Sequence, residues 1–249
     1  MLYYSFQSDS GSGAFTLENY LRFFSKPFYM ELTRRTIVNS LVVTVICLVI
    51  AFPLAYIMAK KFRRSSMVIL AMLMLPFFTN QMVRVYSWLV FLQDGGILER
   101  LLNALGLAEG RLGILYTQTA VLIALVQVYF SYMVITLYMA LDRLDDSLLE
   151  ASANLGASKV STFFKVILPL SWPGMLSGCL LVFVPCLGSF VEPRILGGVN
   201  GTVIGTVIED QFFEIYGWNF GAAIAFVLLV MVMITTTLVS RIGEGAETT

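Results

Sequence analysis

The chain has 249 residues, of which 58% are hydrophobic and 13% are charged, and its 16 lysines and arginines balance its 16 aspartates and glutamates. A soluble domain has about a quarter of its residues charged, so the composition favours a membrane protein over a large soluble helical core. The chain has no histidine, which excludes histidine-based metal sites and Ser–His or Cys–His nucleophiles, and no basic stripe indicates nucleic-acid binding.

Residues 1–35 are predicted to be an exposed segment that precedes the first membrane span. They contain no basic stretch followed by an apolar one, so they are not a signal peptide. Within them, "TLENYLRFF" has the pattern of a short amphipathic helix, and Thr16 is suited to cap it.

Five long apolar runs follow, and each is predicted to be a membrane-spanning helix. About 20 apolar residues of helix cross a bilayer core, and backbone groups in hydrocarbon must find their partners inside such segments. The predicted spans are residues 36–59, 65–90, 112–141, 173–191 and 215–240, in a transmembrane domain at 36–241 that is followed by a tail at 242–249. Cys47, Cys179 and Cys186 lie in these runs and are expected to be packing residues rather than disulfide partners.

The segments between the spans differ in character. "KKFRR" places four cations in five residues directly after the first span, and "GGVNGTVIGTVIEDQFFEIYGW" is expected to be a glycine-rich loop before the last one. In "DGGILERLLNALGLAEGR" Gly106 supplies a stop, and the apolar residues fall on one helical face, which predicts an interfacial helix: Ile97, Leu98, Leu101, Leu102 and Leu105. Proline lies inside three of the predicted spans and is expected to kink them: Pro53, Pro76 and Pro185.

A polar insert at residues 142–172 interrupts the apolar pattern. Asp145 can cap a helix through "DSLLEASANL", Gly156 suits the left-handed residue that ends it, and Ser158 can cap a second helix. The second helix has apolar residues at i, i+3, i+4 and i+7: Val160, Phe163, Phe164 and Ile167. We expect Pro169 to stop this helix and Pro173 to start the next span. The product is a helix–turn–helix that either lies on the lipid surface or docks in a groove of another protein.

The motif inside this insert resembles a known signature. The pattern E-A-A-x-x-x-G, nine residues, I-x-L-P marks the cytoplasmic loop of the membrane subunits of ATP-binding-cassette importers. The matching positions here are Glu150, Ala151, Ser152, Gly156, Val166, Leu168 and Pro169, with Ser152 in place of the second alanine and Val166 in place of isoleucine. Lysine and arginine counts on the two sides of the membrane are equal, so they do not set the orientation. The resemblance implies that the insert and the C-terminus are cytoplasmic and that the N-terminus is outside.

The resemblance extends along most of the chain. "FTLENYLRFF", "LPFFTNQMVRVYSW" and "FVEPRILGG" are similar to the spermidine/putrescine branch of these permeases. That family usually has six spans, and its first span has no counterpart here, from which we expect an upstream start that encodes it. Glu192 and Arg194 lie where related permeases often carry apolar or differently charged residues.

The function implied is that of a permease subunit, whose insert couples the path to a separate ATPase. The chain contains no G-x-x-x-x-G-K-[ST] motif, so we expect no ATPase site of its own, no cofactor and no metal. The implied partners are cassette ATPase subunits, a second permease, a periplasmic binding protein and membrane lipid, in a bacterial inner membrane. The implied cargo is a polyamine or related amine.

Carboxylates and aromatic rings are candidates for the path of such a cation. The residues chosen are Glu192, Asp210, Tyr86, Tyr129 and Trp218, although tyrosine and tryptophan also serve as interfacial anchors. Glu209 and Glu214 add to an acidic outer mouth. Alternative functions are a permease for another nitrogenous solute, such as an amino-acid conjugate or a phosphonate, a secondary transporter, an intramembrane enzyme and a structural scaffold.

Overall fold

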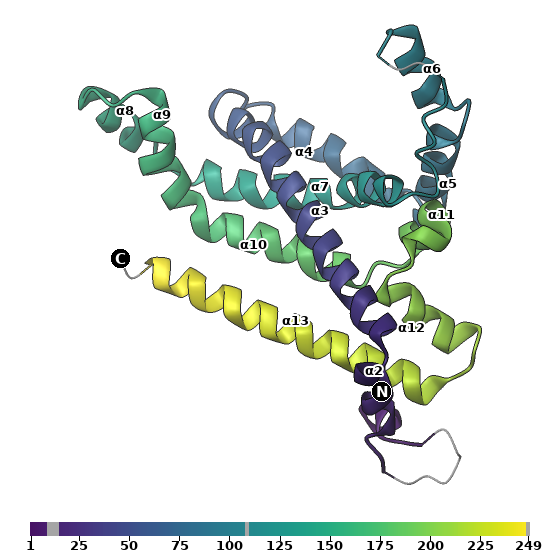
Figure 1. The fold of residues 1–249 in the computed structure, drawn as a ribbon. Coiled ribbons are helices and arrows are strands. Elements are labelled where there is room, and N and C mark those ends of the chain that lie inside the picture. Colours follow the sequence, from purple (N-terminus) through teal and green to yellow (C-terminus); the bar gives the residue numbers. More distant parts are fainter. Residues whose placement is uncertain (9–14, 108–109, 248–249) are drawn as a thin grey trace. The chain divides into compact units, whose positions relative to one another are not determined.

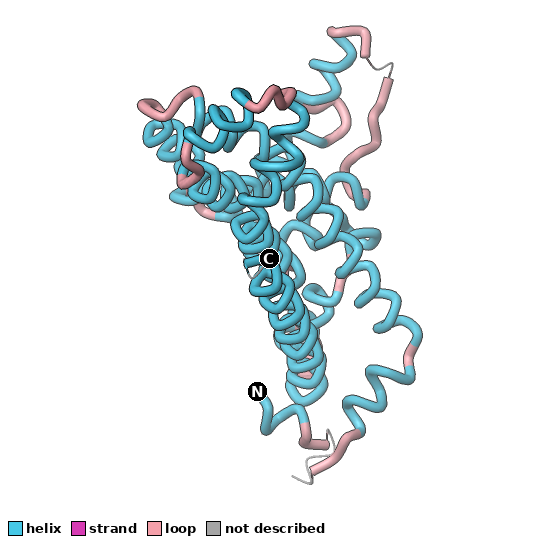
Figure 2. Tube along the Cα trace, turned by 90° about the vertical axis from the view of Figure 1, so that its left-hand side faces the viewer, coloured by secondary structure: helices cyan, strands magenta, loops and turns pink. Residues whose placement is uncertain are grey.

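The computed structural model describes residues 1–8, 15–107 and 110–247, and in these ranges the chain consists of helices joined by short connections (Figures 1 and 2). The strand-like pairing in the described ranges is limited to an isolated antiparallel bridge between Gln7 and Phe15. The all-α expectation is therefore confirmed. In the described ranges no disulfide joins Cys47, Cys179 and Cys186, as expected of packing residues.

Four described helical runs are long and apolar enough to cross a membrane, and a broken pair provides a fifth candidate. The four are Pro27–Lys60 (α3), Gln118–Asp142 (α7), the continuous run Lys159–Leu187, and Trp218–Arg241 within α13 (Trp218–Glu247). Five predicted spans are thus matched when the broken pair counts as one.

The first span is longer than predicted, because α3 begins at Pro27 rather than near residue 36. Proline suits the first helical position, where its missing N–H has no intrahelical role and its φ is already helical. On an exposed face of the added turns, Arg34 bonds Glu31 with 2.8 Å between Nη2 and Oε1. Pro53 lies inside α3, which continues through it.

The second predicted span, residues 65–90, is broken, and the break lies at the kink expected from Pro76. The chain forms Ser66–Met74 (α4), tightens into a 3₁₀ turn at Leu75–Phe78 (η1), and restarts as Gln81–Leu92 (α5). Pro76 lies in the 3₁₀ turn, and Asn80 caps the new helix by accepting a hydrogen bond from the N–H of Met82 at 2.8 Å. A proline that removes a donor and a residue that caps the next helix together account for the break.

The fourth span does not begin after a gap marked by two prolines, so that prediction was wrong. The helix Leu168–Leu187 (α10) runs through both Pro169 and Pro173 and is continuous with the second helix of the polar insert. Pro169 lies inside this continuous run, where it has no N–H to donate to a carbonyl of the preceding turn. Proline therefore marks the first turns of α10 rather than a gap before it.

The glycine-rich loop expected before the last span is mostly helical. It contains Val191–Gly197 (α11), a 3₁₀ turn at Gly198–Gly201 (η3) and Ile204–Phe213 (α12). At the start of α12, the N–H of Val203 donates to Thr206 Oγ1 (3.1 Å) and the N–H of Ile204 donates to Thr36 Oγ1 (3.0 Å). A threonine on α3 thus satisfies a donor at the first turn of α12, and a sequence pattern does not show that contact.

The predicted interfacial helix is present as Ile97–Ala104 (α6), and Gly106 ends it in the left-handed region with φ +68°. Leu98 packs against a buried cluster, whereas Ile97 and Leu101 are more than half exposed. The helix and its stop are therefore confirmed, and its place at a membrane surface stays a prediction.

The chain divides into two compact units, each with its own packing. The first comprises Met1–Val42, Thr79–Leu125 and Val184–Ile234. In it, α2 (Glu18–Ser25), α3, α12 and α13 share a buried cluster: Phe23, Tyr29, Leu32, Ile204, Val207, Phe220 and Ile224. A second cluster joins α5, α7 and α11: Val85, Leu92, Ala120, Ala124, Val191 and Leu196. The N-cap of α2 is Leu17 and not the predicted Thr16, although Thr16 Oγ1 accepts a hydrogen bond from the N–H of Glu18 at 3.1 Å.

The second unit comprises Val43–Phe78, Val126–Phe183 and Thr235–Thr249. Hydroxyl groups connect its helices, because Ser131 Oγ donates to the carbonyl of Leu73 at 3.0 Å and Ser66 Oγ lies 2.9 Å from Tyr138 Oη. Gly174 of α10 lies so close to Ala140 of α7 that a Cβ on the glycine would overlap the alanine's own Cβ. Small residues spaced by four let membrane helices approach, and Gly178 follows one turn later.

We expect Gly174→Ala to lower the stability of the protein by about 1–3 kcal/mol, because the added methyl group meets a rigid Cβ. Gly178→Ala is the matched control: there the nearest atom is Met133 Sδ at 2.9 Å, the movable end of a flexible side chain. The measurement is the thermal unfolding midpoint in detergent. Equal midpoints for the two variants would contradict the close α7–α10 contact.

Candidate coupling segment and acidic cluster

The polar insert forms the predicted helix–turn–helix: Asp146–Asn154 (α8), a turn at Gly156, Lys159–Thr162 (α9) and a π-turn at Phe163–Ile167 (η2). Figure 1 shows α8 and α9 as adjoining short helices. Asp145 accepts a hydrogen bond from the N–H of Ser147 at 2.9 Å, and Ser158 Oγ accepts one from the N–H of Ser161 at 3.2 Å. Both predicted caps are therefore confirmed.

The cap at Asp145 depends on its carboxylate being ionised. The backbone N–H of Ser147, followed by the Ser147 hydroxyl, lowers the pKa of Asp145 below its ordinary value by binding the charged form. A lowered pKa in the folded protein means that this contribution is present at neutral pH and is lost as the pH falls through that pKa.

The turn between the two helices is fixed by one glycine and one hydrogen bond. Gly156 has φ +79°, and a Cβ built on it would meet no atom within 4 Å, so the need for glycine is conformational rather than steric. Ser152 Oγ and Thr162 Oγ1 lie 2.8 Å apart across the turn. The serine that replaces alanine in the motif thus adds a bond between the two helices.

The cations after α3 hold the base of the insert. Lys60 Nζ donates to the carbonyl of Leu144 at 2.8 Å and to Asp146 Oδ1 at 2.5 Å. Arg63 pairs with Asp142 at 3.5 Å and reaches Asp146 at 4.0 Å. These contacts, which the sequence pattern did not predict, give the "KKFRR" stretch a structural role that is separate from any role in orientation.

The second helix of the insert does not present a single apolar face, so that expectation was wrong. In the π-turn the N–H of Leu168 donates to the carbonyl of Phe163, five residues back, which changes the helical phase. Ile167 is buried and the Phe163 ring lies 5.5 Å from Phe52, whereas Val160 and Phe164 are 66% and 59% exposed.

The turn of the insert therefore presents apolar and acidic groups outward. Leu155 is 88% exposed, and Glu150 is exposed on α8. The other motif residues lie along the same segment: Ala151 and Ser152 in α8, Val166 in the π-turn, and Leu168 and Pro169 at the start of α10. The insert thus has a base held by hydrogen bonds and ion pairs and a tip that exposes apolar side chains.

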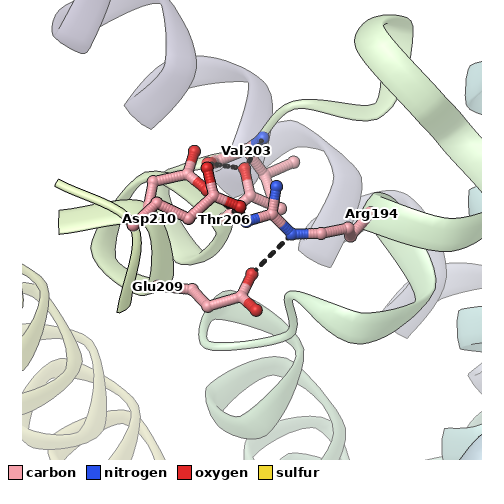
Figure 3. Close-up of polar contacts among 6 residues, drawn as sticks. Arg194, Val203, Thr206, Glu209 and Asp210 are labelled. Atoms are coloured by element: carbon pink, nitrogen blue, oxygen red, sulfur yellow. Dashed lines mark hydrogen bonds and ion pairs between the residues drawn. The ribbon is translucent and has the colours of Figure 1, made fainter. Parts of the chain in front are cut away.

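A second polar site joins α11 to α12 in the first unit (Figure 3). Arg194 Nε donates to Glu209 Oε2 at 2.7 Å, and its Nη2 bonds Asp210 and, at 3.1 Å, Glu214 Oε1. The hydrogen bond to Glu209 is the largest cause that raises the pKa of Arg194 above its ordinary value. One guanidinium thus faces three carboxylates.

Glu192, two residues before Arg194 in the sequence, has a different partner: it is 2% exposed, and Gln81 Nε2 donates to its Oε1 at 3.1 Å. Gln81 is the first residue of α5, so this bond ties the restart of the broken span to α11. A buried carboxylate in a membrane protein is a candidate functional group by default.

The predicted aromatic path residues are not gathered at these carboxylates. Tyr86 is 58% exposed on α5. Trp218 lines a separate apolar cavity of about 500 Å³ with Met1 and Phe213. Tyr129 is buried beside Tyr132 in the second unit, with 6.3 Å between ring centres. Of the five chosen residues, Glu192 and Asp210 belong to the α11–α12 region.

Several long apolar helices that carry a capped polar insert define a multi-pass α-helical membrane protein of the transport class. Residues 48–243 match the family of binding-protein-dependent transport system inner membrane components, and the chain belongs to this family, the permease subunits of ATP-binding-cassette importers.

Its relatives agree with this assignment. The chain is 39% identical to the spermidine/putrescine transport system permease protein PotB of Escherichia coli, over 87% of this chain and 78% of the relative. It is 38% identical to PotB of Haemophilus influenzae, over 91% and 80%. The fold resembles that of a bacterial ABC transporter involved in import of the polysaccharide alginate, with TM-score 0.71 and 18% identity over 97% of this chain and 87% of that one.

We expect Arg194→Gln to destabilise the α11–α12 region by about 1–3 kcal/mol, because three carboxylates lose their shared charged donor. The matched control is Arg34→Gln, which removes a pair whose side chains are 72% and 53% exposed and which should lower the stability less than Arg194→Gln does. Thermal unfolding midpoints of the two variants in detergent decide the matter. A larger effect at Arg34 would show that the Arg194 cluster is not structural.

Proposed function

We propose that this permease subunit serves a polyamine importer and carries spermidine, putrescine or a related amine. The observation that carries the proposal is the 38–39% identity, over about nine-tenths of the chain, to permeases named for spermidine and putrescine transport. The acidic excess around Arg194 supports it, because ammonium groups are attracted to clustered carboxylates.

The insert is the proposed site of coupling to a separate ATPase. Its base is held by Lys60 and Arg63, and its tip offers Leu155, Phe164 and Glu150. Apolar side chains can fill a groove on the ATPase subunit, and the glutamate can accept charge-assisted hydrogen bonds there. In this proposal the insert and the C-terminus are cytoplasmic, the N-terminus is outside, and ATP is hydrolysed by the partner and not by this chain.

The proposed mechanism is alternating access driven from the insert. Closure of two cassette ATPase subunits on ATP moves the grooves that hold the insert of this chain and that of a second permease. The helices continuous with the insert transmit the motion, because α10 follows the π-turn without a break. A periplasmic binding protein delivers the cargo, which gives the assembly its selectivity.

The acidic cluster gives Arg194 a proposed second role on the cargo's path. Its guanidinium already occupies the carboxylates that would attract an amine, so an incoming ammonium group competes with Arg194 for Glu209, Asp210 and Glu214. Competition of this kind keeps binding weak enough for release. An anion such as a phosphonate finds repulsion at the same place, which favours amines over that alternative.

We expect Glu150→Ala and Gly156→Val each to abolish ATP-driven uptake while the protein still inserts in the membrane. Valine at φ +79° is strained because it is β-branched, which distorts the turn that presents the docking tip. The matched control is Gly106→Val, at φ +68° with equally open space but outside the insert. Uptake into proteoliposomes of the assembled complex is measured, together with copurification of the ATPase.

Normal uptake in both insert variants, or the same loss in the Gly106 control, would show that the insert is not the coupling element.

We expect spermidine and putrescine to compete for uptake when the cognate binding protein is present. The assay follows a labelled polyamine in proteoliposomes and adds unlabelled amines, an amino-acid conjugate, phosphonate or sulfate in excess. Inhibition by the amines alone supports the proposed cargo. If phosphonate or sulfate competes and the polyamines do not, the cargo assignment is wrong, although the coupling role of the insert stands.

A further inference from the structure

Two cavities in the second unit adjoin at Tyr56 and Phe163, which line both of them. One cavity, of about 480 Å³, is bounded by the end of α3 and by the insert, and Lys61, Lys159 and Thr162 contribute polar groups to it. The other, of about 380 Å³, is a groove between α3 and the start of α10. Both fall in the size range of small-molecule sites, roughly 300–1,000 Å³.

The groove is apolar along its length. Apart from the two shared rings, it is lined by Leu48, Val49, Phe52, Pro53, Leu168 and Met175. All of these belong to the helical runs Pro27–Lys60 and Lys159–Leu187, which are apolar enough to cross a membrane. The groove therefore lies at a depth where hydrocarbon is the surrounding solvent.

The adjoining cavity is cationic. Lys61 follows the last residue of α3 and Lys159 begins α9, so two chain segments far apart in sequence each supply a positive charge. The described residues that line this cavity include no carboxylate. The neighbouring cations are used differently, since Lys60 bonds Asp146 and Arg63 pairs with Asp142.

We propose that the two cavities together bind one anionic phospholipid, with its phosphate between Lys61 and Lys159 and an acyl chain in the groove. Basic pockets at the ends of membrane helices favour anionic head groups, and each lysine near the surface contributes about 1 kcal/mol of attraction. The groove selects a lipid over a soluble phosphate, because only a lipid fills the apolar end. The site does not depend on the identity of the cargo.

A lipid bound here connects the membrane to the coupling segment. The cavity walls include Leu149 and Ala153 of α8 and Phe163 of the π-turn, which are parts of the same insert that carries Glu150 and Gly156. Occupancy of the cavity therefore stabilises one position of the insert relative to the end of α3. Anionic lipid content becomes a factor in the stability of the insert.

The test uses the full chain assembled with its partner subunits in lipid nanodiscs. Phosphatidylglycerol and phosphatidylcholine with identical acyl chains compete for the complex, and retained lipid is counted by native mass spectrometry after mild release. We expect a preference for phosphatidylglycerol that falls by about thirtyfold in the double variant Lys61→Gln/Lys159→Gln. The double variant Arg64→Gln/Lys165→Gln removes the same charge from the same two segments at positions that do not belong to the cavity lining, and it should keep the preference.

Four results would overturn the proposal. One is an equal preference in the wild type and the Lys61/Lys159 variant, and another is an equal loss in the Arg64/Lys165 control. The third is a preference that is present in the chain alone and disappears when the ATPase subunits are added, since the ATPase then covers the cavity. Glycerophosphoglycerol, the head group without acyl chains, should fail to displace the lipid; displacement by it or by inorganic phosphate would show a soluble anion site instead.

Discussion

Each break in an apolar helix frees backbone donors and acceptors that hydrocarbon cannot satisfy, and the polar residues of this chain are concentrated at such breaks. Asn80 caps the restart of the second span, and Asp145 and Ser158 cap the two helices of the insert. Thr36 supplies an acceptor for the first turn of α12 from a different helix. Polar side chains at these places permit a membrane protein to bend without leaving bare backbone groups.

Charged side chains also bond backbone and side-chain groups at the ends of helices. Lys60 donates to the carbonyl of Leu144, just beyond α7, and also pairs with Asp146 at the start of α8. One ammonium group therefore bonds both the end of α7 and the start of α8. Arg194 serves three carboxylates, and its neighbour Glu192 receives the amide of Gln81. Charged residues that the sequence places between the spans thus connect the short helices to their neighbours.

Local features of the insert could be predicted from the sequence, because they depend on residues within one turn of each other. The caps at Asp145 and Ser158 and the left-handed Gly156 are of this kind. The stop predicted at Pro169 was wrong. Proline usually ends a helix, but here the helical run continues through it. Whether a helix ends at a proline or continues through it depends on the packing of the whole segment, and no local sequence pattern specifies that packing.

The acidic residues of the α11–α12 site could be predicted from the sequence, but their bonding partners could not. The sequence predicts Glu192 and Asp210 as members of one acidic outer mouth, whereas the structure pairs Glu192 with Gln81 and Asp210 with Arg194. The bond from Gln81 to Glu192 joins residues far apart in the chain, and its formation requires the break at Asn80 that places Gln81 at a helix start. Contacts of this length follow from the packing of helices, which hydrophobic periodicity does not encode.

The π-turn at Phe163–Ile167 determines the direction in which the insert points. A π-turn contains one residue more than the α-helical turn it replaces, and each residue of an α-helix advances the side-chain direction by about 100°. Loss or gain of a single residue here would swing the whole insert around the axis of α10 by that angle while every side chain within the insert kept its neighbours.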